Sequence, residues 1–113
     1  MKSLKKLLPF LEEAELEDLL GKVLASENYR YQDVELRNLL VFLDQSKVDE
    51  LFIEELKKKH DVTMFLPFVN HETLKNIVEL YCTNKLEYEI DVSKFAPFLD
   101  ADDIKLLYRH FNN

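Results

Sequence analysis

The chain carries three histidines and one cysteine, the side chains most often used to bind zinc or to act in acid–base and nucleophilic catalysis. The histidines are His60, His71 and His110, and no two have the i, i+4 spacing that presents both imidazole rings from one helix turn. Neither an HExxH nor a CxxC motif occurs. A zinc site would need ligands from three separate parts of the fold, so we expect surface histidines and neither a metal nor a cofactor.

The acidic run from Asp100 to Asp103 is a weak match to the opening of a calcium-binding loop. An EF-hand loop needs glycine at its sixth position and glutamate at its twelfth, where this chain has Lys105 and Phe111. The run is better explained by a helix cap followed by acidic residues in the first turn. Cys82 has no histidine close to it in the sequence, which predicts an inert or partly buried thiol.

An enzyme built on this chain would need His71, Glu72 or Asp102 to converge in a cleft. A glycine-rich phosphate-binding loop is excluded, because the chain has only one glycine. A general acid needs burial or a close partner to shift its pKa, and the sequence shows no sign of either. We therefore predict a non-catalytic protein with no catalytic residues, while a small enzyme whose site is not visible in the sequence is an alternative.

Three tyrosines, Tyr29, Tyr31 and Tyr88, lie outside the helix-forming patterns, in two longer connections. Tyrosine is enriched at protein interfaces because it combines a large apolar ring with a hydrogen-bonding hydroxyl. We therefore take these three residues as candidate contacts to a partner. The alternative is that their rings cover the gaps between neighbouring structural units.

The charge of the chain narrows the classes of partner. The net charge is −7, and residues 1–56 hold 13 acidic against 7 basic side chains. Nucleic acid is an unlikely partner because its binding needs clustered positive charge, although a helical regulatory domain associated with nucleic acid is the alternative function. An acidic first half favours a basic or mixed protein surface. The single cysteine and the lack of a long apolar run predict a cytoplasmic protein that does not associate with membranes.

The elements that must position these residues are indicated by a pattern that occurs four times. Its centres are Phe10, Phe42, Phe68 and Phe98. Apolar residues recur six, nine and ten positions after each phenylalanine, a spacing that makes one stripe on a helix and no coherent face on a strand. We expect a longer helix after each phenylalanine and place the four phenylalanines in the core. Glu55 stands where the other repeats are apolar, and we expect Leu56 to replace it.

A shorter helix is expected before each phenylalanine, ending or kinking at the Pro-Phe pair where proline is present, because proline has no amide hydrogen to donate. The expected caps of these short helices are Ser3, Asp33, Asp61 and Asp91. The long helices are expected to start at Glu12, Asp44, Asn70 and Asp100.

The predicted fold is therefore all-α, with about eight short helices in a single domain, 1–113. They form four helical-hairpin repeats in a compact α-solenoid-like array, at approximately 3–25, 33–58, 61–84 and 91–113. The connections 25–32 and 84–90 resemble each other, which predicts a duplicated two-repeat unit with halves of approximately 1–57 and 58–113. Such arrays usually offer one surface to a partner, so we expect a protein–protein interaction or assembly module that binds a protein partner or itself.

Overall fold

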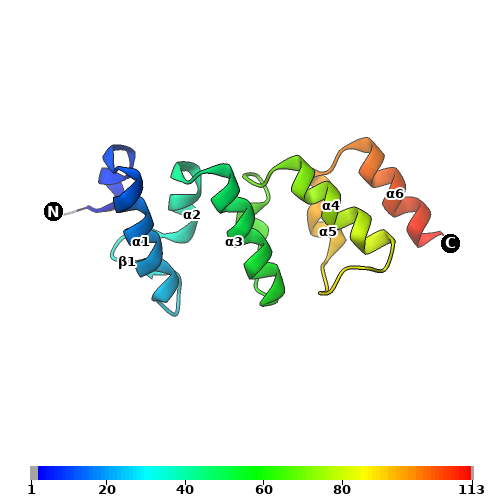
Figure 1. Ribbon diagram of the computed structural model, residues 1–113, viewed down its shortest axis with the longest axis horizontal. Helices are drawn as coiled ribbons and strands as arrows, with labels where there is room; N and C mark the ends of the chain where they lie inside the picture. Colours follow the sequence, from blue (N-terminus) through cyan, green and yellow to red (C-terminus); the bar gives the residue numbers. More distant parts are fainter. Residues whose placement is uncertain (1–2, 113) are drawn as a thin grey trace. The chain divides into compact units, whose positions relative to one another are not determined.

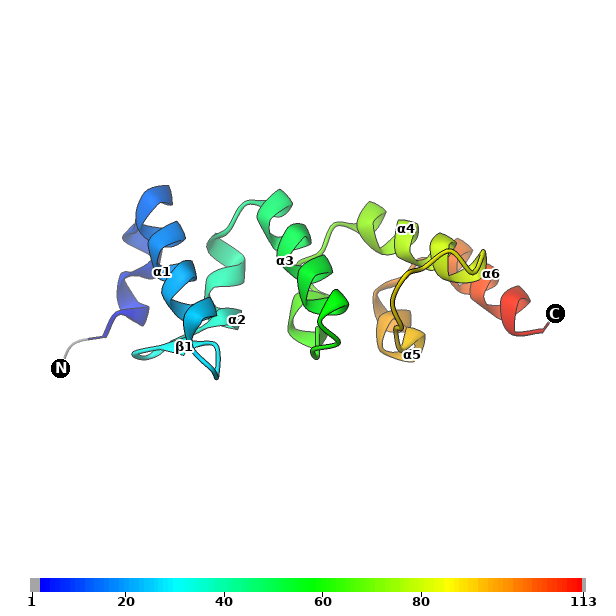
Figure 2. The ribbon, with the colours of Figure 1, turned by 60° about the horizontal axis from the view of Figure 1, so that its bottom comes forward.

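The computed structural model describes residues 3–112. The prediction of an all-α chain is confirmed, because most of these residues are helical and the sheet they contain has two short strands (Figures 1 and 2). The chain divides into two compact units, with the boundary between Asp44 and Gln45. Within residues 3–112, none of the helices has both the length and the apolar character needed to cross a membrane.

The first unit consists of a long helix, the short helices before and after it, and a small hairpin. Its helices are η1 (Lys5–Phe10), α1 (Glu13–Ala25), α2 (Leu36–Leu39) and η2 (Leu40–Phe42), η denoting a 3₁₀ helix. The strands β1 (Arg30–Tyr31) and β2 (Val34–Glu35) pair in an antiparallel hairpin next to α1 (Figure 1). Leu19, Leu20 and Val23 form the buried face of α1, which packs against β1 and α2.

The hairpin changes two of the predicted caps. Asp33 does not begin the second short helix, which starts at Leu36 with Glu35 before it. Asp33 lies in the hairpin turn, where its carboxylate accepts hydrogen bonds from the Ser3 hydroxyl (2.6 Å) and the Lys5 backbone N–H (3.1 Å). Ser3 is therefore not the cap of η1; a side chain from the hairpin satisfies the first turn of that helix instead.

The second unit contains three further long helices and the short helical segments between them. Its elements are α3 (Gln45–Lys57), η3 (Thr63–Phe65), α4 (His71–Cys82), α5 (Val92–Phe95), η4 (Ala96–Phe98) and α6 (Ala101–Phe111). Phe52 of α3 is fully buried, and the centre of its ring lies 6.2 Å from that of Phe65 and 6.0 Å from that of Phe95. Helices α4 and α6 pack against each other.

The four phenylalanines that define the repeated pattern were placed in the core, and this prediction is wrong for Phe10 and Phe98. Phe10 is 80% exposed and Phe98 is 37% exposed, whereas Phe42 and Phe68 are partly buried. Phe10, Phe42 and Phe98 all end 3₁₀ helices before an extended residue, so the end of a short helix alone does not bury the ring. The leucines two residues earlier, Leu8, Leu40 and Leu66, are buried in three of the four short segments.

Glu55, which stands at an otherwise apolar position of the repeated pattern, is buried. Leu56 is buried as expected, and so is Glu55 beside it. The Glu55 carboxylate lies 2.9 Å from Nδ1 of His60, and the His60 backbone N–H donates to the Glu55 carbonyl (3.0 Å). His60 thus turns back on the end of α3 and supplies the polar partner that a buried carboxylate requires.

Candidate functional site

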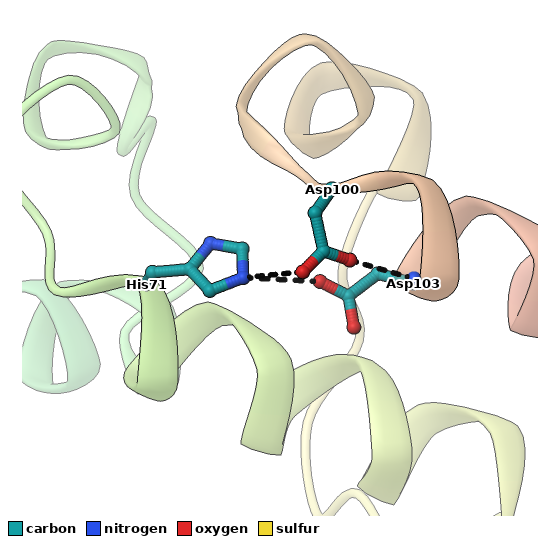
Figure 3. A group of neighbouring side chains, drawn as sticks. All are labelled: His71, Asp100 and Asp103. Carbon is teal, nitrogen blue, oxygen red and sulfur yellow. Dashed lines mark hydrogen bonds and ion pairs between the residues drawn. The ribbon is translucent and has the colours of Figure 1, made fainter.

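Three side chains from two helices that are far apart in the sequence meet where α4 and α6 begin (Figure 3). His71 is the first residue of α4, Asp100 is the N-cap of α6, and Asp103 lies in the first turn of α6. Nε2 of His71 lies 2.9 Å from Oδ2 of Asp100 and 3.7 Å from Oδ2 of Asp103. One donor atom of each residue lies within 4.8 Å of the other two, and we call this group the His–Asp cluster.

The helix starts that carry the cluster are fixed by local caps. The Asn70 side chain accepts the Glu72 backbone N–H (2.9 Å) at the start of α4, and Oδ1 of Asp100 accepts the Asp103 backbone N–H (3.0 Å) at the start of α6. Both caps satisfy amides that have no partner within the helix. Because one oxygen of Asp100 is used by its own helix, the other is free to face His71.

The pKa values of the two carboxylates in the cluster are shifted in opposite directions. The backbone N–H of Asp103, followed by the His71 side chain, lowers the pKa of Asp100. Burial, followed by the charge of Asp100, raises the pKa of Asp103. Asp103 is only 2% exposed, and its Oδ2 is buried without a hydrogen-bond donor among residues 3–112. Asp103 is therefore the member of the cluster whose negative charge is least compensated.

The cluster differs from the set that the enzyme hypothesis required. His71 meets Asp100 and Asp103, whereas Glu72 and Asp102 are exposed beside them. Asp102 and Asp103 line an open hollow of about 370 Å³ together with Lys75, Glu79 and Arg109. Chemically, the cluster can hold a proton between an imidazole and two carboxylates, or it can offer one nitrogen and two oxygens to a cation.

The three candidate tyrosines are all partly buried and fall in different units, Tyr29 and Tyr31 in the first and Tyr88 in the second. The Lys22 ammonium lies 5.3 Å from the centre of the Tyr31 ring, and both residues line a hollow of about 420 Å³. Tyr88 lines a second hollow, of about 390 Å³, and burial followed by the charge of Glu87 raises its pKa. Their role as partner contacts stays a prediction.

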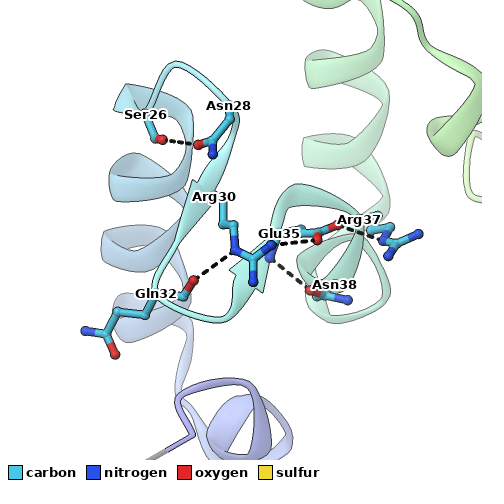
Figure 4. Close-up of polar contacts among 7 residues, drawn as sticks. All are labelled: Ser26, Asn28, Arg30, Gln32, Glu35, Arg37 and Asn38. Atoms are coloured by element: carbon cyan, nitrogen blue, oxygen red, sulfur yellow. Dashed lines mark hydrogen bonds and ion pairs between the residues drawn. The ribbon is translucent and has the colours of Figure 1, made fainter.

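Polar contacts hold the hairpin that carries Tyr29 and Tyr31 (Figure 4). Glu35 pairs with Arg30 (3.3 Å) and with Arg37 (2.9 Å), and its backbone N–H donates to the Asn38 side chain (2.9 Å). Arg30 also donates to the Gln32 carbonyl (3.1 Å). Both tyrosines are thus presented from a segment that is ordered by its own side chains.

Part of the apolar stripe of α6 is exposed on the surface of the second unit. Ile104, Tyr108 and Phe111 are 39%, 71% and 61% exposed, and their i, i+4, i+7 spacing places them on one face. We call these three residues the α6 stripe. In α4, the residues at the offsets of Ile104 and Tyr108, which are Leu74 and Val78, are buried. Helix α6 instead buries Asp103 and Leu107.

The sequence could not place the α6 stripe at the surface, because its apolar spacing matches that of the helices that are buried. Comparisons with protein-family models, curated proteins and solved structures found no match to this chain.

Proposed function

We propose that the chain is a non-catalytic protein-interaction module whose α6 stripe binds an apolar helix of a protein partner. The observation that carries this proposal is the difference between two helices with the same apolar spacing. Leu74 and Val78 of α4 are buried, whereas Ile104 and Tyr108 of α6 are exposed. Large apolar side chains gathered on one exposed face are typical of interaction sites.

The chemistry of the partner is inferred from α3, where Phe52 occupies the position that Tyr108 occupies in α6. Phe52 is covered by Phe65 and Phe95, which are supplied by the short helices η3 and α5. A partner segment that mimics this arrangement is a short helix with an aromatic or leucine side chain. The net charge of −7 favours a partner with a basic or mixed surface around that helix.

The arrangement of the helices as four stacked hairpin repeats, duplicated as a pair, belongs to the same proposal. It is supported by the regular order of short and long helices, with the long helices beginning at Glu13, Gln45, His71 and Ala101. Each of these residues stands three positions after the phenylalanine of its repeat. A cytoplasmic location is part of this proposal as well.

The proposal is tested with a matched pair of charge substitutions. Tyr108→Glu places a charge in the middle of the α6 stripe, and Leu80→Glu makes a comparable change at an exposed apolar residue of α4. Light scattering at two concentrations first separates self-association from binding to another protein. Partners captured with the wild-type chain are then purified, and their affinities for the wild-type chain and both variants are measured.

The proposal expects at least a tenfold weaker affinity for Tyr108→Glu and little change for Leu80→Glu, with circular dichroism showing both variants folded. Equal binding by Tyr108→Glu and the wild-type chain would refute it. If Tyr29→Ala or Tyr31→Ala abolishes binding while Tyr108→Glu does not, the hairpin tyrosines form the contact and the α6 stripe does not.

A further inference from the structure

The second unit contains two junctions between long helices, and they differ in how their polar groups are satisfied. Where α3 meets α4, Asp49 accepts hydrogen bonds from the Asn70 backbone N–H (3.0 Å), the Gln45 side chain (2.9 Å) and the Thr73 hydroxyl (3.2 Å). Gln45 also donates to the Phe68 carbonyl (2.8 Å). One carboxylate thus receives three donors, so this junction is complete without a bound ion.

The junction between α4 and α6 has an excess of acceptors. Asp100 and Asp103 bring two carboxylates, and the side-chain donor that faces them is Nε2 of His71. This nitrogen is 2.9 Å from Asp100, but it is 3.7 Å from Asp103, which is beyond hydrogen-bonding distance. Oδ2 of Asp103 is buried and accepts no hydrogen bond among the described residues, although it points into the cluster.

We propose that the His–Asp cluster binds a divalent transition-metal ion, with zinc as the best fit. The donor set is one imidazole nitrogen and two carboxylate oxygens, a combination that suits zinc and related ions. A tetrahedral zinc ion with bonds of about 2.0–2.1 Å holds neighbouring ligand atoms about 3.3 Å apart. The separations of 2.9 Å and 3.7 Å from His71 to the two aspartates lie on either side of that value.

Charge and exposure agree with this assignment. Two ionised carboxylates balance the charge of the ion, and the ion supplies a ligand-bond partner for Oδ2 of Asp103, which accepts no hydrogen bond within residues 3–112. His71 and Asp100 are exposed, which leaves the remaining coordination position open to water.

Binding changes the state of His71. Without a metal, Nε2 of His71 donates to the Asp100 carboxylate only when it carries the proton, whereas a metal-bound Nε2 must present its lone pair. The proton of the neutral imidazole then resides on Nδ1, which is directed away from both carboxylates in Figure 3. The N-terminal ends of α4 and α6 both carry partial positive charge, which weakens cation binding and makes both carboxylates necessary.

The test is calorimetric titration of the metal-free full chain with zinc chloride and, separately, with magnesium chloride. Asp103→Asn is the principal variant, and Asp102→Asn, an exposed neighbour outside the cluster, is its matched control. His71→Gln is the second variant, because it introduces the residue found at the corresponding position of α3, Gln45. His110→Gln controls for adventitious binding of zinc to a histidine of α6.

The expected result is binding of one zinc ion per chain and no detectable binding of magnesium. Asp103→Asn and His71→Gln should each weaken zinc binding by at least about tenfold, as expected when a metal ligand is lost, whereas both controls bind zinc like the wild-type chain. Zinc should also raise the melting temperature of the wild-type chain. Without metal, Asp103→Asn should melt at a higher temperature than the wild-type chain, and zinc should raise its melting temperature little.

Two results would overturn the proposal. One is the absence of detectable zinc binding at about 1 mM zinc, which corresponds to a dissociation constant weaker than millimolar. The other is zinc binding that is unchanged in both Asp103→Asn and His71→Gln. Because each variant is also followed by circular dichroism without metal, loss of the fold is distinguished from loss of the ligand, and His71→Gln decides the question if Asp103→Asn does not fold.

Discussion

Replacing Phe52 with alanine should strongly destabilise the second unit, whereas the same replacement at Phe10 should have little effect. Phe52 is 0% exposed and packs between Phe65 and Phe95. A phenylalanine buries about 150–250 Å², so at about 25 cal/mol per Å² its burial contributes roughly 4–6 kcal/mol. Measured losses for such substitutions in protein cores are about 3–5 kcal/mol, a large part of the total stability of a domain.

Phe10→Ala is the matched control. It makes the same chemical change at a phenylalanine that the sequence pattern placed in the core but that the structure leaves exposed. Phe10 is 80% exposed, so the same area calculation gives a contribution of at most about 1 kcal/mol. The assay is urea unfolding followed by circular dichroism at 222 nm, with the midpoint and slope of each transition fitted separately.

The difference between the two variants should therefore be at least about 2 kcal/mol in the free energy of unfolding. If Phe10→Ala lowers the free energy of unfolding as much as Phe52→Ala does, Phe10 belongs to the core and its exposure of 80% is wrong.

Three further predictions concern single side chains. Asn70→Ala should lower the free energy of unfolding by about 1 kcal/mol, because it removes the cap of α4, and Asn70→Ser should retain most of it in the same urea assay. The pKa of Asp103 is raised in the folded state, so its contribution to stability is fully present below its unfolded pKa and is lost as the pH rises through the folded value. Asp103→Asn should therefore raise the melting temperature at pH 7 in metal-free buffer, and a gain of the same size at pH 3 would contradict this reasoning. Burial raises the pKa of the Cys82 thiol, so iodoacetamide should alkylate it more slowly at pH 8 than in 6 M urea; equal rates would show an exposed thiol.

The starts of the long helices were predictable because caps depend on residues that are close in the sequence. Asn70 and Asp100 accept amides two and three residues ahead, so the type of the capping residue and the apolar spacing after it suffice. Burial around the phenylalanines was not predictable in this way. Leu8 and Phe10 both fit an apolar pattern, but Leu8 is buried and Phe10 is exposed, and their spacing in the sequence does not distinguish them.

The hairpin was missed because it lacks the glycine that usually marks a tight turn. Gln32 takes the left-handed conformation there, with a φ of 55°, which non-glycine residues adopt only rarely. The His–Asp cluster was missed because 29 residues separate His71 from Asp100. One signal was available: Gln45 and His71 stand at the same offset in successive repeats, and both reach towards the start of the next long helix.

The bonds from Asp33 to Ser3 and Lys5 have a consequence for the order in which the first unit folds. They span 30 and 28 residues, so η1 gains its capping partner only after the whole of α1 and the hairpin turn have been synthesised. A 3₁₀ helix of six residues has little stability of its own, since few backbone bonds offset the entropy lost in ordering it. During translation, η1 should therefore remain unstructured until residue 33 has left the ribosome. It should then form at the same time as the hairpin, when Asp33 bonds to Ser3 and Lys5.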